Sequence, residues 1–162
     1  MSYRVTARSN IKRIKRDLEN LFLRAEVLPE QDEITGEINR YLIVRTCGFL
    51  EQSLVLAARS LCESRSGAEA LRFAHSWLER SPNPRKDEIL KLVHRFNETW
   101  SDELVVILNQ DEKGSRINAL VGIRNDIAHG KNQGVSRRQA WEYFQLASEI
   151  VDWVLERFEP QQ

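Results

Sequence analysis

Hydrophobic residues recur every three or four positions along most of the chain, the spacing that lines one face of an α-helix. The segment from Ile34 to Glu63 shows this spacing most strongly, because two rows run side by side along it. The first row is Ile43, Cys47, Leu50, Leu54, Ala57 and Leu61, and the second is Val44, Gly48, Glu51, Val55, Ala58 and Cys62. We therefore expect a central helix that is buried over a wide arc. Glu51 in this arc needs a basic or hydrogen-bonding partner, because burial of an unpaired carboxylate raises its pKa.

The same spacing predicts helices on both sides of this central segment. They cover Val5 to about Val27, 67–80, 85–96, a less regular piece through Leu108, Lys113 to Ala128, and a last helix that ends near Phe158. Local signals agree with these bounds: a Ser81-Pro82-Asn83-Pro84 turn, Asn97 as a cap or break, Gly130 as a C-terminal cap, and Ser136 with Gln139 as a capping box. No segment alternates with period two. The sequence predicts one all-α domain over 1–162 with its core at about 5–158, in which four long helices dominate and shorter ones lie between the second and third.

The composition is typical of a globular domain. Of the 162 residues, 41% are hydrophobic and 30% are charged, with 7 Gly and 4 Pro, which excludes collagen-like, low-complexity and wholly disordered chains. No apolar run approaches the roughly 18 residues of a membrane helix, and the N-terminus lacks the apolar core of a secretory signal. We expect a cytoplasmic protein without a membrane segment. Cys47 and Cys62 fall in the apolar central helix, where thiols behave as small buried hydrophobes.

The formal net charge is zero, from 24 basic and 24 acidic residues, so nucleic-acid binding would depend on local segregation of charge. Such segregation exists: residues 1–24 hold seven Lys or Arg against two acids, and residues 26–37 hold five acids and no base. Among the last twenty residues, most of the charged ones are acidic. The basic side chains of the first helix, at positions 12, 13, 15 and 16, either guide an RNA strand or face water. The sequence leaves both interpretations open.

The string Gly122-Ile123-Arg124-Asn125-Asp126-Ile127-Ala128-His129-Gly130 places strong polar groups on an otherwise apolar helix. Asn125 and His129 are one turn apart on the same face, and the long side chain of Arg124 can lean toward them. Histidine with a pKa near about 6.5 accepts a proton at neutral pH, and the arginine fork suits phosphate oxygens. These groups suffice for metal-free RNA cleavage. His129 takes the proton of a ribose 2′-hydroxyl, that oxygen attacks the phosphorus, and Arg124 stabilises the phosphorane. DNA lacks this hydroxyl and would not react.

A purely structural interpretation of the same string stays open. In it Asn125, Asp126 and His129 cap the end of a helix, and Arg124 pairs with Glu51. The remaining histidines, His75 and His94, have no second ligand at metal-binding spacing, so we interpret them as ordinary surface or core residues. The sequence shows no zinc pattern, Walker loop or Gly-rich dinucleotide turn, and we expect no metal or cofactor.

The string RNDIAHG resembles the Arg-x4-6-His motif of the HEPN superfamily, and RYLIVRTCGFLEQSL (Arg40 to Leu54), FNETWSDEL and the closing helix resemble its RiboL-PSP-HEPN branch. The resemblance covers most of residues 10–158. It implies a four-helix-core fold, a homodimer that brings two motifs together and, in many members, metal-independent endoribonuclease activity in toxin–antitoxin, abortive-infection or other antiviral systems. It also implies Arg124 and His129 as the catalytic pair, with Asn125 as the polar residue between them.

A homodimer also follows from the chemistry, because cleavage needs a base and an acid while each motif contains one histidine; a two-fold interface supplies the second. We expect supporting roles for Glu51, Arg45 and Asp126. The residues expected to contact RNA are Lys131, Arg116, Lys12 and Arg16. The main hypothesis is a homodimeric ribonuclease controlled by an antitoxin or another regulatory protein. The alternatives are a non-catalytic HEPN module for dimerisation or for binding a nucleotide or partner, and a helical scaffold without a site.

Overall fold

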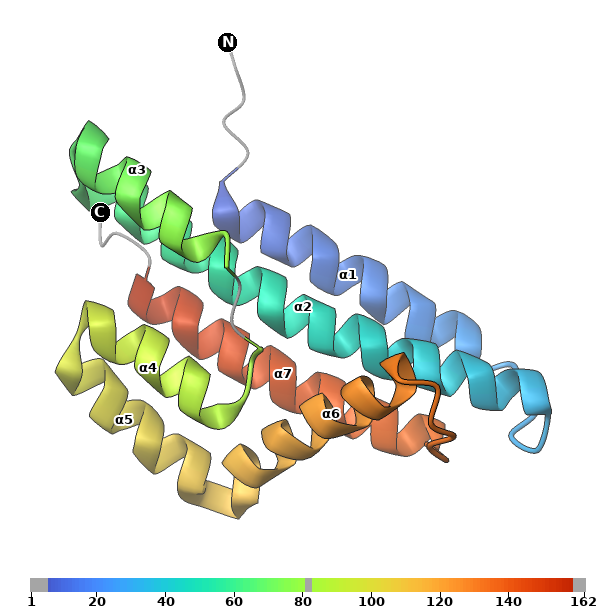
Figure 1. Ribbon diagram of the computed structural model, residues 1–162. Coiled ribbons are helices and arrows are strands. Elements are labelled where there is room, and N and C mark those ends of the chain that lie inside the picture. Colours follow the sequence, from blue (N-terminus) through green and yellow to red (C-terminus); the bar gives the residue numbers. More distant parts are fainter. Residues whose placement is uncertain (1–5, 81–82, 159–162) are drawn as a thin grey trace, which may run out of the picture.

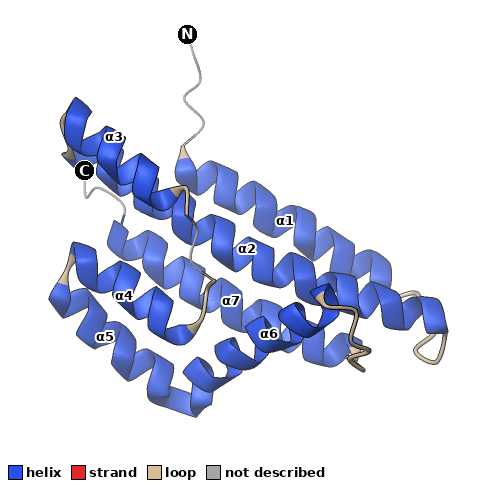
Figure 2. Ribbon diagram, in the orientation of Figure 1, coloured by secondary structure: helices blue, strands red, loops and turns tan. Residues whose placement is uncertain are grey.

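The computed structural model describes residues 6–80 and 83–158, and within these ranges it contains seven α-helices, one 3-10 helix and no strand (Figures 1 and 2). The elements are α1 (Ala7–Ala25), α2 (Glu33–Arg65), α3 (Ala68–Leu78), α4 (Lys86–Phe96), α5 (Glu98–Asn109), the 3-10 helix η1 (Gln110–Glu112), α6 (Lys113–Ala128) and α7 (Arg137–Phe158). The predicted all-α class is confirmed. So is the arrangement of four long helices, α1, α2, α6 and α7, with shorter helices between the second and third of them.

Helix α2 is central to the bundle, as its two rows predict. It packs against α1, α3, α6 and α7, and Figure 1 shows it running between α1 and α7 for most of its length. All six residues of the first row are buried. In the second row Ala58 and Cys62 are buried, whereas the other four residues, Glu51 among them, are half-buried. The second row therefore forms the margin of the buried arc.

The length of α2 bears on the expected absence of a membrane segment. By length and composition alone, Glu33–Arg65 is long and apolar enough to cross a membrane. The helix contains no long continuous apolar run, because Arg45 and Glu51 and uncharged polar residues such as Thr46 and Ser53 interrupt it. Thr46 and Ser53 are buried, and 56% of the most apolar window lies inside the protein. Four neighbouring helices cover α2, so its apolar character is accounted for by its place in the core.

Local capping signals set several helix ends. Asn97 Oδ1 accepts a hydrogen bond from the Trp100 backbone N–H at 3.1 Å at the start of α5, and Ser136 Oγ accepts one from the Gln139 N–H at 3.1 Å directly before α7. Both signals are confirmed. The first helix is shorter than predicted: α1 ends at Ala25 and Val27 is 84% exposed, because the chain turns into the acidic loop that contains the helix-breaking Pro29. The predicted start at Val5 lies outside the described residues.

The buried apolar side chains form one core cluster, and aromatic rings join α1 to α7 within it. The ring centroid of Phe22 lies 5.2 Å from that of Trp141 and 5.3 Å from that of Phe144. Trp141, predicted to face inward, is 39% exposed, because it lies at the margin of the contact between the two helices. The aromatic cluster is thus open to solvent along one edge, at Trp141.

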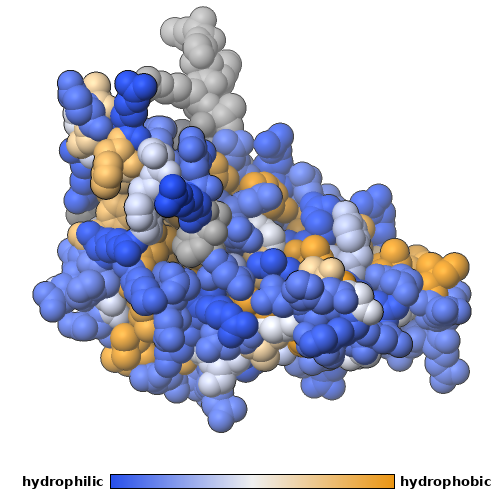
Figure 3. Space-filling model, in the orientation of Figure 1, coloured by the Kyte–Doolittle hydropathy of each residue, from blue (hydrophilic) through white to orange (hydrophobic). Residues whose placement is uncertain are grey.

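On the face shown in Figure 3, apolar side chains form separate groups among hydrophilic ones.

Candidate functional site

The motif string lies at the C-terminal end of α6, a helix that packs across α2 (Figure 1). Gly130 has a φ of +74°; its N–H donates to Ile127 O at 3.0 Å, and the Lys131 N–H donates to Asp126 O at 2.9 Å. This pair of hydrogen bonds is a Schellman ending, which favours glycine because it has no Cβ to clash in the left-handed region. The predicted cap at Gly130 is confirmed. His129 occupies the C-cap position, and the residue is exposed.

Arg124 lies where α6, α2 and the turn before α4 meet. Its Nη2 donates to Asn83 Oδ1 at 3.0 Å and lies 3.9 Å from Glu51 Oε2. The pairing of Arg124 with Glu51, as the structural interpretation has it, is confirmed. The two side chains keep 28% and 31% of their surface exposed, so solvent screens this ion pair and it contributes little to stability. Both contacts use Nη2, and the guanidinium retains further donors.

The buried Cys47 thiol lies on the inner side of Arg124. Burial raises the pKa of this thiol above its ordinary value, the Arg124 guanidinium acts in the opposite direction through a hydrogen bond and its charge, and Glu51 adds a smaller upward effect. Cys47 therefore stays protonated at neutral pH and behaves as the small buried hydrophobe that the sequence predicts. Arg124 thus has apolar core on one side and solvent on the other.

The loop that follows the motif is tied to Asp126. The carboxylate of Asp126 accepts hydrogen bonds from Lys131 Nζ at 3.1 Å and from Gln133 Nε2 at 2.7 Å. These contacts hold the chain beyond His129 against the last turn of α6. Asp126 therefore ties the loop after His129 to the end of α6, and its supporting role in the reaction stays a prediction.

Three residues that the sequence did not single out also position this region. Asn83 binds Arg124, as described above. From the first turns of α2, Arg40 Nη1 donates to Asn132 Oδ1 at 3.1 Å, and the buried Asn39 donates to Val135 O at 3.0 Å. A polar residue in a Pro-flanked turn was the available signal for Asn83, because such a turn holds its side chain in a fixed place. No local signal marks Arg40 or Asn39, whose partners lie more than ninety positions away in the sequence.

Arg45, for which we expect a supporting role, contacts a residue of its own helix, and that role stays a prediction. Its Nη1 donates to Tyr41 Oη at 2.9 Å, and its guanidinium carbon lies 5.6 Å from the centroid of the Tyr41 ring. Both residues belong to α2. Within residues 6–80 and 83–158, no hydrogen bond or ion pair links Arg45 to the motif. Glu51, six residues further along α2 than Arg45, forms the ion pair with Arg124.

Of the four residues expected to contact RNA, one lies beside the motif and three lie elsewhere on α1 and α6; their contact with RNA stays a prediction. Lys131 lies beside it and pairs with Asp126, whereas Arg116 lies near the start of α6, about three and a half helical turns from His129. Lys12 and Arg16 are exposed on α1, which packs against α2 and α7, while α6 packs against α2, α4, α5 and α7. Among the expected contacts, Lys131 alone adjoins the motif.

The histidines outside the motif behave as surface or marginal residues. His94 is exposed on α4, and His75 Nε2 lies 3.4 Å from Glu63 Oε1. In the part of the chain that the structure describes, no group of three or more His, Cys, Asp or Glu residues is arranged to hold a metal ion.

Arg124 and His129 both lie in the last part of α6 and its C-cap. The backbone N–H of His129 donates to the backbone oxygen of Asn125 at 3.0 Å, which confirms that the two residues are one helical turn apart. Across the described ranges neither the Asn125 amide nor the His129 ring makes a side-chain hydrogen bond, and none joins either to Arg124. The convergence of the three side chains therefore stays a prediction. The end of α6 therefore offers an exposed imidazole, which can accept a proton, and a partly exposed guanidinium that other side chains orient.

The matched family accounts for nearly the whole chain. Residues 9–157 match RiboL-PSP-HEPN. The chain belongs to this family. The matched span of this HEPN protein includes α2 and α6 in full, and with them both members of the Arg124–Glu51 pair. Membership supports a nuclease or nucleotide-binding type of module as the protein class. No curated protein sequence and no solved structure matches the chain.

Proposed function

We propose that this HEPN protein is a metal-independent endoribonuclease whose catalytic residues are Arg124 and His129. The observation that carries the proposal is that Asn83 and Glu51 hold the Arg124 guanidinium in place on the helix whose end carries the exposed His129. A guanidinium oriented in advance stabilises a charged transition state without reorganising at the moment of reaction. Membership in a family of nuclease or nucleotide-binding modules supports the same assignment.

The proposed reaction needs no group beyond the chain and its RNA. His129 accepts the proton of the ribose 2′-hydroxyl, the freed oxygen attacks the adjacent phosphorus, and the P–O5′ bond breaks to leave a 2′,3′-cyclic phosphate. Arg124 donates to the non-bridging oxygens as their charge grows. The leaving 5′-oxygen takes a proton from a second acid, and we assign this role to His129 of the partner in a homodimer. Asn125 contacts the phosphate or orients the ring.

The biological setting that we propose is a cytoplasmic toxin or phage-defence effector. Its activity is restrained by an antitoxin or another regulatory protein, and its substrate is single-stranded or loop RNA. Because its net charge is zero, the protein as a whole does not attract a polyanion. RNA binding would therefore depend on specific contacts with local groups of residues.

The test is a cleavage assay on total RNA in excess EDTA. We expect the wild-type protein to cut RNA, and we expect Arg124→Ala and His129→Ala each to reduce the rate by about two to four orders of magnitude. The matched controls are His94→Ala and Arg72→Ala, which remove exposed side chains from α4 and α3 and should leave the rate unchanged. Circular dichroism establishes that all four variants fold.

Two results would refute the assignment. One is cleavage that survives both motif substitutions, and the other is cleavage that the chelator abolishes. Family membership supports one second candidate, a non-catalytic module that uses the same helix end to bind a nucleotide. A folded wild-type protein that cuts no RNA in EDTA but binds a nucleotide, and loses that binding with Arg124→Ala, would establish this second function.

A further inference from the structure

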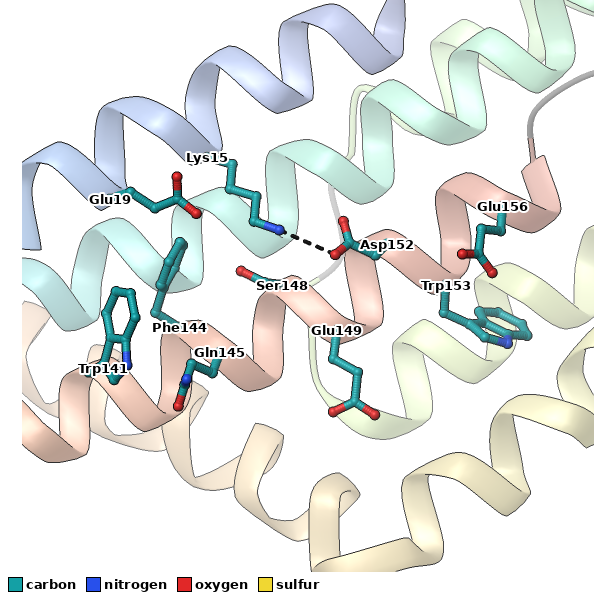
Figure 4. A pocket seen from close by; sticks show the side chains of 10 residues that line it. All are labelled: Lys15, Glu19, Trp141, Phe144, Gln145, Ser148, Glu149, Asp152, Trp153 and Glu156. Atoms are coloured by element: carbon teal, nitrogen blue, oxygen red, sulfur yellow. Dashed lines mark hydrogen bonds and ion pairs between the residues drawn. The ribbon is translucent and has the colours of Figure 1, made fainter.

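A groove between α1 and α7 lies apart from the motif and is unused by the proposed reaction. Its volume is about 550 Å³, within the range of small-molecule sites. Figure 4 shows side chains from both helices around it, with Trp141 at one end, Trp153 at the other and Phe144 on the wall between them. The groove therefore has an aromatic lining long enough for an extended small molecule.

Carboxylates surround this aromatic lining. Glu19 reaches the groove from α1, while Glu149, Asp152 and Glu156 come from α7, where spacings of three and four residues place them on one stripe. The single base among the lining residues is Lys15, whose Nζ lies 3.2 Å from Asp152 Oδ2. The groove thus carries an excess of negative charge.

Two of these carboxylates are available to a ligand. Glu149 pairs with Lys113, and Asp152 with Lys15. In the described part of the chain, Glu19 and Glu156 make no hydrogen bond or ion pair. One lies on each side of the groove, because they belong to different helices.

A buried hydroxyl provides independent evidence that the groove takes a ligand. Ser148 is 8% exposed, and its Oγ is buried without a hydrogen-bond partner in the described part of the structure. Figure 4 shows this oxygen pointing into the groove toward α1. Buried polar groups in native proteins nearly always have a partner, so an N–H or O–H donor that enters the groove would complete the site.

We propose that this groove binds a small aliphatic polyamine, a chain of ammonium groups separated by short methylene segments. The ammonium groups donate to Glu19, Glu156 and Ser148 Oγ, and the methylene segments lie on the aromatic lining. The ring faces also attract cations, and Trp153 already has the Arg157 guanidinium carbon 5.5 Å from its ring centroid. The alternation of carboxylates with apolar rings matches the alternation of charge and methylene along such a ligand. This binding does not depend on the proposed ribonuclease activity.

The test is calorimetric titration of the full chain with spermidine at low ionic strength. We expect saturable binding at one molecule per chain, with the affinity reduced at least about tenfold in a Glu19→Gln/Glu156→Gln double variant. Ser148→Ala should weaken binding by roughly twofold to fivefold, because one neutral hydrogen bond is lost. The matched control is Glu69→Gln, which removes an exposed carboxylate from α3 and should bind as the wild type does.

The comparison separates a built site from general attraction between opposite charges. Equal affinities for the wild type and the double variant would overturn the proposal, as would the absence of saturable binding to the folded wild type. Equally tight binding of a neutral diol of similar length would also overturn it, because the site would then select apolar length rather than charge. The double variant must retain the circular dichroism spectrum of the wild type.

Discussion

Asn83 and Glu51 hold the Arg124 guanidinium in different ways, and single substitutions can separate them. The Asn83 amide accepts a hydrogen bond at 3.0 Å, whereas the closest oxygen of Glu51 is 3.9 Å away. The contact with Asn83 is short enough for a hydrogen bond, whereas the contact with Glu51 is only an ion pair. We therefore assign the orientation of the guanidinium chiefly to Asn83, a positioning residue that does not itself touch the phosphate.

We predict that Asn83→Ala lowers the rate of RNA cleavage by about tenfold without changing RNA affinity, because a hydrogen bond to a charged group is lost. Single-turnover kinetics with a labelled RNA separate the rate from the affinity. Asn83→Asp, which keeps an acceptor oxygen at the same place, should restore most of the rate, and Asn20→Ala on the exposed face of α1 serves as the control. A purely structural role for Asn83 would instead lower the thermal midpoint and leave the rate of the folded enzyme unchanged.

At the level of single helices, one glycine inside α6 and one directly after its C-cap should respond in opposite ways to replacement by alanine. Gly122 lies inside the helix, and a Cβ built there has no atom within 4 Å. Gly130 ends the helix with a φ of +74°. A helix interior favours alanine over glycine, while the left-handed region favours glycine over alanine.

We predict that Gly122→Ala raises the free energy of unfolding by about 0.5–1 kcal/mol and that Gly130→Ala lowers it by about 1 kcal/mol. Urea denaturation monitored by circular dichroism measures both. Gly134→Ala is the control in the adjacent loop, since its Cβ also meets open space and its φ lies outside the left-handed range; its effect should be small. If Gly130→Ala raised the free energy of unfolding as Gly122→Ala does, the end of α6 would not require the left-handed conformation.

At the scale of the whole molecule, the proposed chemistry requires two copies of the chain. Each motif offers one histidine, whereas the reaction uses one group to remove a proton and another to donate one. The basic first helix does not replace the second copy, because α1 contains no histidine, its Lys12 and Arg16 are exposed, and its Lys15 pairs with Asp152.

We predict that the wild-type protein and the Arg124→Ala and His129→Ala variants are all homodimers at micromolar concentration. Size-exclusion chromatography with light scattering measures this directly, with the monomer mass of 18.9 kDa as the reference. An active protein that stays monomeric under the assay conditions would exclude the two-motif site. The acid would then have to come from the same chain or from water.

The helices, the buried face of α2 and most of the helix ends could be predicted from the sequence alone. These depend on positions three or four apart and on caps such as Asn97, Gly130 and Ser136, and such interactions are local in the chain. The family was also accessible from the sequence, because the motif and the Arg40–Leu54 segment are contiguous strings. The sequence placed Trp141 on the inner face but could not determine how far the margin of α7 opens, because α1 sets that limit.

The contacts of each motif side chain depend on the tertiary structure and do not follow from the sequence pattern. Arg124 meets Asn83 and Glu51 because α6 packs across α2 beside the turn before α4, and no local pattern encodes a contact between residues 41 positions apart. The structure also shows that Arg45 binds Tyr41 of its own helix, and that carboxylates and the Ser148 hydroxyl lie together at the α1–α7 groove. Periodicity specifies which face of a helix is buried, whereas the packing of one helix on another decides which residues of the two faces meet.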